Sequence, residues 1–139
     1  MKRAFFLDAN LILYALGGPH PLREPWIRIL ERIKLGKVHV LSNTEVLQEI
    51  LHRYLSIAKP EIAETAYTSM IQLCQTVFPV SLEETHQALK LMKANPGITS
   101  RDAIHAATMI NNGIREIIST DSHFDLITGI KRIDPARFS

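Results

Sequence analysis

The sequence predicts an α/β fold, a three-layer α/β/α sandwich with a mostly parallel central sheet. Short apolar runs that suit buried strands alternate along the chain with longer segments whose apolar residues recur at helical spacing. Connections long enough to hold a helix favour parallel strands with helices on both faces of the sheet. The length is typical of one globular unit, so we expect residues 1–139 to form a single domain.

The N-terminal part of the chain contains a strand, a short helical piece and a longer helix. Residues 4–7 (AFFL) form an apolar run bounded by polar residues, which suits a strand buried on both faces. Residues 11–16 form a short helical segment that ends at a Gly-Gly-Pro turn. Pro25 suits the first helical position of the next helix, which Gly36 ends.

A second strand and two helices follow. Residues 38–41 (VHVL) have the composition of a short strand. Ser42 or Asn43 then caps a helix whose apolar stripe covers residues 46–54. Residues 60–75 form the next helix, which opens with proline.

A third strand and its helix come next. We expect this strand over residues 76–80, and Pro79 indicates the strand's end or an edge position. The helix after it begins at Ser81 or Leu82 and ends near residues 95–97, an Asn-Pro-Gly turn signal.

The last helix and two strands complete the predicted sheet. Ser100 caps the helix, which ends at residues 112–113, an Asn-Gly pair. Residues 116–119 (EIIS) are the fourth strand, and residues 131–133 (KRI) are the fifth. In sheets of this kind, ligands bind beyond the carboxyl ends of the strands.

The composition excludes several classes of protein. The chain has 16 Lys and Arg against 14 Asp and Glu, and a net charge of +2 is too small to indicate a nucleic-acid surface by itself. The single cysteine, Cys74, excludes an internal disulfide framework and a thiolate zinc site, which favours a cytoplasmic location. Since no run reaches about 18 apolar residues and no signal peptide is evident, we expect no membrane association.

The acidic residues fall at positions that can face one edge of the sheet. Asp8 and Asp121 follow two predicted strands, while Glu45, Glu49 and Asp102 lie early in helices that follow loops. Carboxylates brought close together raise one another's pKa values unless cations neutralise them. Hard oxygen ligands favour Mg²⁺ or Mn²⁺, and such ions could activate a water for phosphodiester cleavage. The pattern therefore indicates a metal-dependent site.

Four segments in this order resemble the motifs of PIN-domain nucleases, and of VapC-type toxins in particular. The match runs from the first strand to residues 133–135 and hence covers nearly the whole chain. Each motif is weak alone, but the ordered set is specific. The segments are FLDAN at 6–10, VLQE at 46–49, SRDAIHA at 100–106 and STDSHFD at 119–125.

The resemblance implies a set of site residues. The acidic cluster would consist of Asp8, Glu49, Asp102 and Asp121, with Asp125 as an outer member. The resemblance further implies that two polar residues, Asn10 and Ser119, orient ligands or bound water. Asn10 follows alanine where many relatives have threonine or serine, a change that should not remove a metal ligand.

The same resemblance implies a function. It indicates an Mg²⁺-dependent (or Mn²⁺-dependent) endoribonuclease that cleaves RNA with a metal-activated water and is the toxin of a type II toxin–antitoxin pair. The expected partners are the RNA substrate, a cognate antitoxin protein and a second copy of the chain. The alternative is a catalytically silent PIN-like module that binds RNA or protein.

The sequence allows more than one role for several polar residues. Glu45 and Glu49 are four residues apart on one helix, so either can serve the site, and the family pattern favours Glu49. Asp125 suits an ordinary turn at least as well as the site. Arg101 suits a phosphate contact or a surface salt bridge. His105 lies on an apolar helix and is left out of the site as a buried histidine, and His123 has no partner at a recognisable metal spacing.

Two basic regions suit a phosphate backbone, although ordinary solvated charge is the commoner role of such residues. The first contains Arg28, Arg32, Lys34 and Lys37, and the second contains Lys131, Arg132 and Arg137.

Overall fold

The computed structural model describes residues 3–138, which contain a five-stranded parallel sheet between layers of helices. Every pairing in the sheet is parallel, and the strand order is β3-β2-β1-β4-β5. The predicted α/β sandwich is therefore confirmed, with a sheet that is wholly parallel within this range. The strands are β1 (Ala4–Leu7), β2 (His39–Asn43), β3 (Thr76–Phe78), β4 (Glu116–Ile118) and β5 (Lys131–Ile133).

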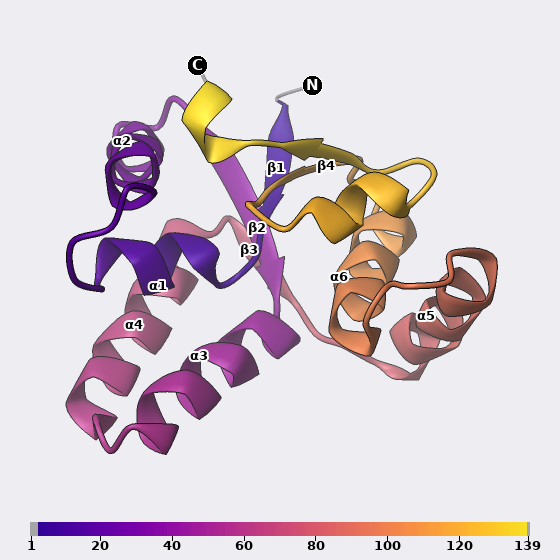
Figure 1. Cartoon of the computed structure of the whole chain (residues 1–139), viewed down its shortest axis with the longest axis horizontal. Helices are drawn as coiled ribbons and strands as arrows, with labels where there is room; N and C mark the ends of the chain where they lie inside the picture. Colours follow the sequence, from indigo (N-terminus) through magenta and orange to yellow (C-terminus); the bar gives the residue numbers. More distant parts are fainter. Residues whose placement is uncertain (1–2, 139) are drawn as a thin grey trace.

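Helices cover both faces of this sheet. Figure 1 shows α5 and α6 on one side, with α1, α2 and α4 on the other. Two short 3₁₀ helices, η1 (Ser122–Leu126) and η2 (Pro135–Arg137), follow β4 and β5. The α-helices are α1 (Asn10–Ala15), α2 (Arg23–Lys34), α3 (Thr44–Ser56), α4 (Pro60–Leu73), α5 (Leu82–Ala94) and α6 (Ser100–Asn111).

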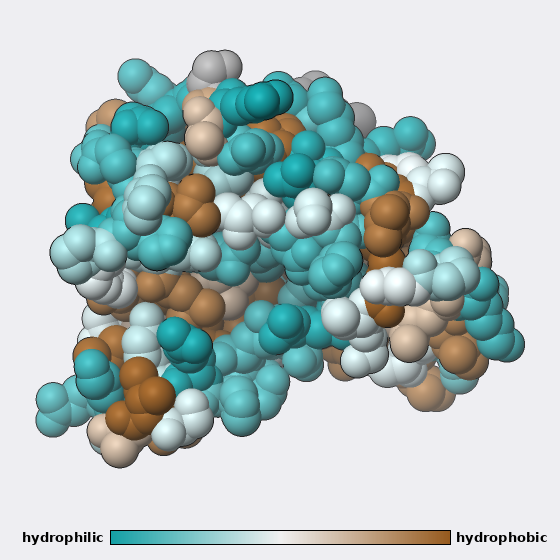
Figure 2. All heavy atoms as spheres, viewed as in Figure 1, coloured by the Kyte–Doolittle hydropathy of each residue, from teal (hydrophilic) through white to brown (hydrophobic). Residues whose placement is uncertain are grey.

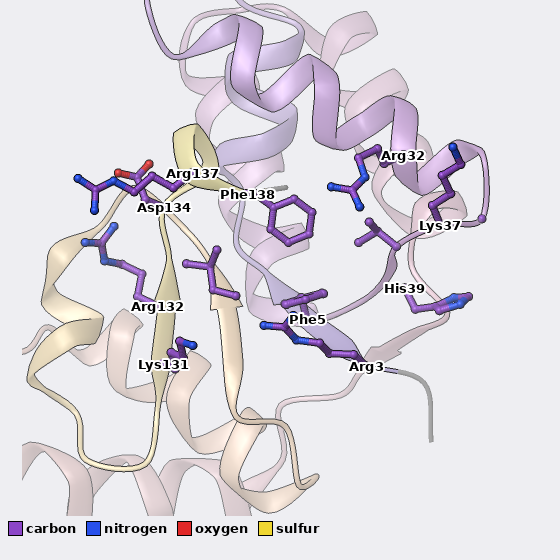
Figure 3. A pocket seen from close by; sticks show the side chains of 13 residues that line it. Arg3, Phe5, Arg32, Lys37, His39, Lys131, Arg132, Asp134, Arg137 and Phe138 are labelled. Carbon is purple, nitrogen blue, oxygen red and sulfur yellow. The ribbon is translucent and has the colours of Figure 1, made fainter.

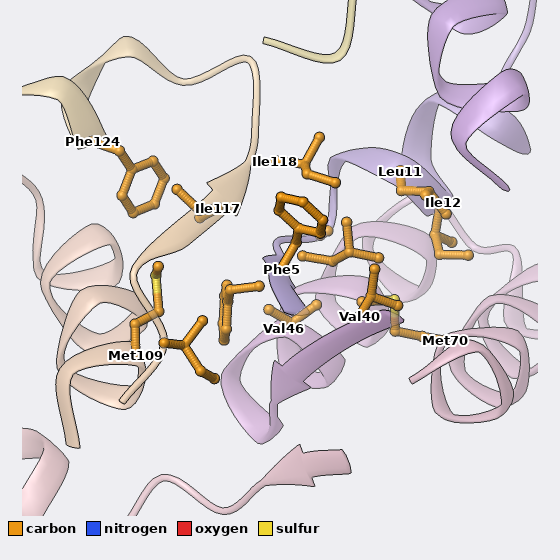
Figure 4. Close-up of a cluster of buried hydrophobic side chains, with 14 of the residues drawn as sticks. Phe5, Leu11, Ile12, Val40, Val46, Met70, Met109, Ile117, Ile118 and Phe124 are labelled. Carbon is orange, nitrogen blue, oxygen red and sulfur yellow. The ribbon is translucent and has the colours of Figure 1, made fainter. Parts of the chain in front are cut away.

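The central strand β1 explains why its sequence is continuously apolar. It pairs with β2 on one side and β4 on the other, and helices pack on both faces, so Phe6 and Leu7 are fully buried. Figure 4 shows Phe5 between side chains of the neighbouring strands, such as Val40 and Ile118, with Met70 of α4 nearby. This packing holds the carboxyl end of β1, where Asp8 follows, in a fixed position.

The caps of two site-bearing helices are settled by hydrogen bonds. Asn43 caps α3, because its side chain accepts the Val46 N–H at 3.0 Å. The alternative, Ser42, is buried and donates its hydroxyl to the Leu7 carbonyl at 2.8 Å. The prediction that Ser100 caps α6 is wrong: Thr99 has the extended backbone of a cap and accepts the N–H two residues beyond Ser100.

Other boundaries differ from prediction by one or two residues. Helix α2 begins at Arg23, so Pro25 is its third residue, which is tolerated because N–H groups of a first turn have no helical partner. Strand β3 ends at Phe78, before Pro79, and lies at an edge of the sheet, so both interpretations of that proline are correct. Helix α4 ends at Leu73 because the next residue turns to an extended backbone.

The surface is predominantly polar with limited apolar areas. Figure 2 shows hydrophobic residues grouped over the α3–α4 corner and around α5, where exposed apolar side chains include Leu55, Ile57, Leu89 and Met92. Within residues 3–138, none of the helices has both the length and the apolar character needed to cross a membrane.

Candidate active site

Four acidic residues from separate elements meet beyond the carboxyl ends of β1 and β4. Asp8 follows β1, Asp121 follows β4, and α3 and α6 contribute Glu49 and Asp102. The topology explains this meeting, because parallel neighbouring strands end at the same edge of the sheet. The pocket between them has a volume of about 160 Å³ and is lined by Asp8, Asn10, Leu13, Glu49, Arg101, Asp102, His105 and Asp121.

Asp8 is buried and held by donors on both oxygens. The Ser119 hydroxyl donates to its Oδ2 at 2.5 Å, and the Asn10 N–H donates to its Oδ1 at 3.0 Å. Burial raises the pKa of Asp8 to about 6, and the hydrogen bonds from Ser119 and Asn10 offset part of that increase. Asn10 also donates its side-chain amide to the Thr120 hydroxyl at 2.9 Å, which ties α1 to the end of β4. The predicted orienting roles of Ser119 and Asn10 are consistent with this geometry.

Asp102 is the least satisfied of the acids. The residue is 3% exposed, and its Oδ2 atom makes no hydrogen bond within residues 3–138. Burial raises the pKa of Asp102, and the neighbouring Asp121 carboxylate raises it further. The Asp102 N–H is bonded to Thr99 Oγ1 at 3.1 Å, so the helix cap fixes its backbone. A buried carboxylate oxygen without a protein donor is available as a ligand for a cation.

His123 lies beside Asp102 and Asp121, a position that sequence spacing did not indicate. Its Nδ1 is 3.0 Å from Asp121 Oδ1 and 3.5 Å from Asp102 Oδ2. Ligand atoms of these three residues all lie within 4.8 Å of one another. Sequence spacing indicated no metal-site partner for His123, whereas the fold brings two carboxylates to it. Its partners are the carboxylate two residues before it and a residue from α6, a contact that spacing alone does not indicate.

Glu49 is held by a chain of hydrogen bonds that begins at the cap of α3. Asn43 Oδ1 accepts the Val46 N–H, so the Asn43 amide nitrogen must face His105 Nδ1, at 3.1 Å. The Asn43 amide nitrogen can only donate, so His105 Nδ1 accepts. The neutral His105 ring therefore carries its proton on Nε2 and donates it to Glu49 Oε1 at 2.7 Å. His105 is buried, as predicted, and it also lines the pocket, a position that the sequence did not indicate.

Of the remaining residues that the sequence left with more than one interpretation, one lines the pocket and two lie outside it. Arg101 lines the pocket rim, with its Nε 3.8 Å from Glu49 Oε1. Glu45 lies outside this pocket in an adjoining shallow groove with Gln48. Asp125 accepts two hydrogen bonds from Arg132, at 3.0 and 3.1 Å, and thereby ties η1 to β5. The structure thus favours the turn interpretation of Asp125.

The donor set fits a hard divalent cation. Four carboxylates face one small pocket, two of them have raised pKa values, and one buried oxygen lacks a donor. Mg²⁺ and Mn²⁺ prefer such oxygen ligands, and a cation would offset both the desolvation of the buried carboxylates and the repulsion between them. The mixed corner of Asp102, Asp121 and His123 adds a nitrogen that Mn²⁺ tolerates better than Mg²⁺.

Comparison with known proteins gives a consistent assignment. Residues 5–130 match the family model described as the PIN domain. Ribonuclease VapC13 of Mycobacterium tuberculosis is 32% identical over 127 residues, which cover 91% of this chain and 97% of the relative.

Solved structures show the same fold at low sequence identity. VapBC2 from Rickettsia felis, solved bound to a DNA fragment from its promoter, matches with a TM-score of 0.72 and 17% identity over 94% of this chain and 99% of that one. VapC20 of Mycobacterium tuberculosis, described as a sarcin–ricin loop cleaving toxin, matches with a TM-score of 0.69 and 16% identity, covering 91% of this chain and 98% of that one.

Proposed function

Because this chain belongs to the PIN-domain family and resembles the VapC ribonucleases within it, we propose that it is a metal-dependent endoribonuclease, the toxin of a toxin–antitoxin pair. The observation that carries the proposal is the gathering of Asp8, Glu49, Asp102 and Asp121 in one pocket beyond the strand ends. Residues 1–139 would act as one domain, in the cytoplasm where RNA is available.

We assign the metal to these four carboxylates. A bound Mg²⁺ or Mn²⁺ ion would stabilise charge on the phosphate and lower the pKa of a water molecule. The chain's own residues prepare the site for it. Ser119 and Asn10 fix the Asp8 carboxylate, and His105 fixes that of Glu49. Preorganised ligands of this kind keep the reacting groups from spending free energy on reorientation.

The remaining pocket residues suit contacts to RNA. Arg101 is exposed at the rim, so its guanidinium would contact a phosphate oxygen of RNA entering the pocket. Leu13 supplies an apolar wall opposite the acids. The chemistry then needs no protein nucleophile, because water attacks the phosphodiester and the acids hold the cation that supports it.

An antitoxin and a second copy of the chain are the expected protein partners. Support for the antitoxin comes from the solved relatives, which include VapBC2 and a toxin–antitoxin complex from Klebsiella pneumoniae. A reading frame for a small DNA-binding protein beside the gene, whose product co-purifies with this chain, would agree with the proposal. Dimerisation stays a prediction, testable by light scattering of the purified chain.

The direct test is an RNA cleavage assay. Fluorescent single-stranded RNA is incubated with wild type and with Asp8→Asn, in Mg²⁺, in Mn²⁺ and in EDTA. We expect cleavage only by wild type and only with a metal ion. Equal cleavage by both proteins would exclude the assigned centre.

Sequencing of RNA ends covers the case of a narrow substrate. Wild type and Asp102→Asn are expressed under control, and the RNA ends in the two cultures are compared. New ends confined to wild type would give both activity and target. Identical ends in both cultures, together with inactivity in the direct assay, would favour the catalytically silent module.

A further inference from the structure

A second cleft in the described chain lies between α2, β1 and β5, away from the acidic pocket. It has a volume of about 840 Å³ and opens beside the amino ends of β1 and β2 and along β5, near η2. The cleft residue of β1 nearest to the acidic pocket is Phe5, three residues of extended chain, about 10 Å, before Asp8, and the two linings share no residue. The cleft is therefore distinct from the proposed catalytic site.

The cleft joins the two basic regions that are far apart in the sequence. Figure 3 shows Arg32, Lys37 and His39 along one side and Lys131, Arg132 and Arg137 along the other. Six of the chain's 16 Lys and Arg residues line the cleft, whereas Asp134 is the acidic lining residue. Arg28 and Lys34, the other members of the first region, lie outside it.

Most of this positive charge is not neutralised by the protein. Arg3 pairs with Glu116, and Arg132 pairs with Asp125. Across residues 3–138, the other four cationic residues that line the cleft form no ion pair. Of these, Lys37, Lys131 and Arg137 are exposed, and Arg32 is half-buried. Concentrated unpaired cations on a chain of net charge +2 attract a polyanion locally.

Between the two sides, the cleft has an aromatic floor. Phe5 and Phe138 meet edge to face with ring centroids 5.2 Å apart. The Arg32 guanidinium lies 5.1 Å from the Phe138 ring centroid, and that of Arg3 lies 4.8 Å from the Phe5 ring centroid. Phe5 is buried and packs beneath the half-buried Phe138 ring. The Phe138 ring beside the Arg32 guanidinium suits a base or sugar of unpaired RNA, with lysines for its phosphates.

We propose that this basic cleft is a second RNA-binding site, which holds the phosphate backbone of one or two unpaired nucleotides outside the cleaved segment. The RNA assignment rests on the proposed function, but binding can be measured without cleavage. RNA is favoured over an acidic protein segment because cations on both sides of an aromatic floor match a chain of alternating phosphates and bases. The volume suits one or two nucleotides, within the usual range for small-ligand clefts.

The test measures binding of a fluorescein-labelled, mixed-sequence single-stranded RNA of 15 nucleotides by anisotropy, in EDTA. The cleft variant is Lys37→Gln/Lys131→Gln/Arg137→Gln. The matched control is Lys59→Gln/Lys90→Gln/Lys93→Gln, which removes the same charge from exposed positions outside the cleft. Thermal unfolding of each variant shows that it is folded.

We expect the cleft variant to bind roughly ten-fold more weakly at moderate salt, and the control to bind within two-fold of wild type. The slope of log K against log salt should fall by about 2 in the cleft variant, since each phosphate contact to a single strand contributes about 0.7. Equal losses in the two variants, no loss in the cleft variant, or no RNA binding by wild type would overturn the proposal.

Competition separates RNA from the other candidate occupant. Poly-glutamate peptide of similar charge is added to the wild-type complex and should displace the RNA only weakly. A peptide that binds wild type more tightly than RNA does, and loses that binding in the cleft variant, would overturn the proposal in favour of an acidic protein partner. Cleavage activity enters none of these readouts, so failure of the proposed nuclease function would be seen separately.

Discussion

Two regions of this chain leave carboxylates with similarly small exposed fractions, yet the pKa values of these carboxylates shift in opposite directions. Glu84, on α5, is 6% exposed and accepts the Ser81 N–H at 2.9 Å, the Ser81 hydroxyl at 2.6 Å and the Asn111 amide at 2.7 Å. These hydrogen bonds lower the pKa of Glu84. Asp8 and Asp102 are 6% and 3% exposed, yet burial raises the pKa of both.

The difference distinguishes a structural acid from a site acid. Glu84 joins the start of α5 to the end of α6, and all of its donors come from the protein. Asp102 keeps a buried oxygen without a donor, and its neighbour Asp121 adds a like charge. Burial alone therefore does not mark a functional carboxylate. At Asp102 a shortage of donors combined with a nearby like charge does so, because a cation can relieve both. Asp8 has donors on both oxygens, and its pKa is raised chiefly by burial.

The largest expected difference between the two regions is the effect of a substitution on the rate of RNA cleavage. Asp102→Asn keeps the side-chain shape but removes a charged ligand, so we expect RNA cleavage to fall by about 10³-fold. Glu84→Gln should leave the cleavage rate within a few-fold, because Glu84 lies outside the pocket. The measurement is the initial cleavage rate in saturating Mn²⁺. Equal losses in the two variants would show that the comparison reflects folding and not chemistry.

The pH dependence of stability should have opposite signs at the two places. The pKa of folded Asp8 is raised from 3.8 to about 6, so its contribution to stability is present below about pH 4 and is lost as the pH rises through 6. The loss amounts to at most about 3 kcal/mol in the metal-free chain. The pKa of Glu84 is lowered, so its contribution is present above its ordinary value of 4.5 and is lost as the pH falls below it.

Urea unfolding in EDTA across pH 3–8 measures both effects. Relative to wild type, Asp8→Asn should gain stability as the pH rises from 4 to 7. Glu84→Gln should lose its disadvantage as the pH falls below 4.5, where the wild-type carboxylate also becomes protonated. Parallel profiles for wild type and Asp8→Asn would contradict the raised pKa.

Metal binding should stabilise the protein through the acidic pocket and not through Glu84. At a Mn²⁺ concentration of 100 times the dissociation constant, wild type should gain about 2.7 kcal/mol of unfolding free energy. Glu84→Gln should gain the same amount, whereas Asp102→Asn should gain little. Thermal shift in Mn²⁺ against EDTA measures the gain. A full shift in Asp102→Asn would mean that the ion binds elsewhere.

The positions of the acids at strand ends could be predicted because the signals are local. Asp8 follows an apolar run, Asp121 follows another, and a parallel sheet brings such ends together. Helix boundaries were less accurate. Adjacent hydroxyl residues at positions 99 and 100 are equally good caps by composition, and only the backbone geometry separates them.

Contacts between distant segments explain what the sequence did not reveal. Glu45 and Glu49 share one side of α3, so spacing could not choose between them; the contact with His105 of α6 places Glu49 in the pocket. His123 meets Asp102 across two elements. The basic cleft likewise forms only when β5 and α2 are brought together, so neither basic region indicated it alone.

The smallest expected effect concerns how Glu49 is held. In contrast to Asp102, Glu49 has a protein donor, the Nε2–H of His105, so it lies between the two extremes of the comparison. His105→Ala should weaken Mn²⁺ binding by about ten-fold, because an orienting partner of a metal ligand is lost. His105→Gln should restore most of the affinity, since its amide can donate to Glu49 while its oxygen accepts from Asn43. Mn²⁺ affinity by calorimetry separates this role from simple packing: if His105→Gln were as weak as His105→Ala, the ring would serve the core and not the carboxylate.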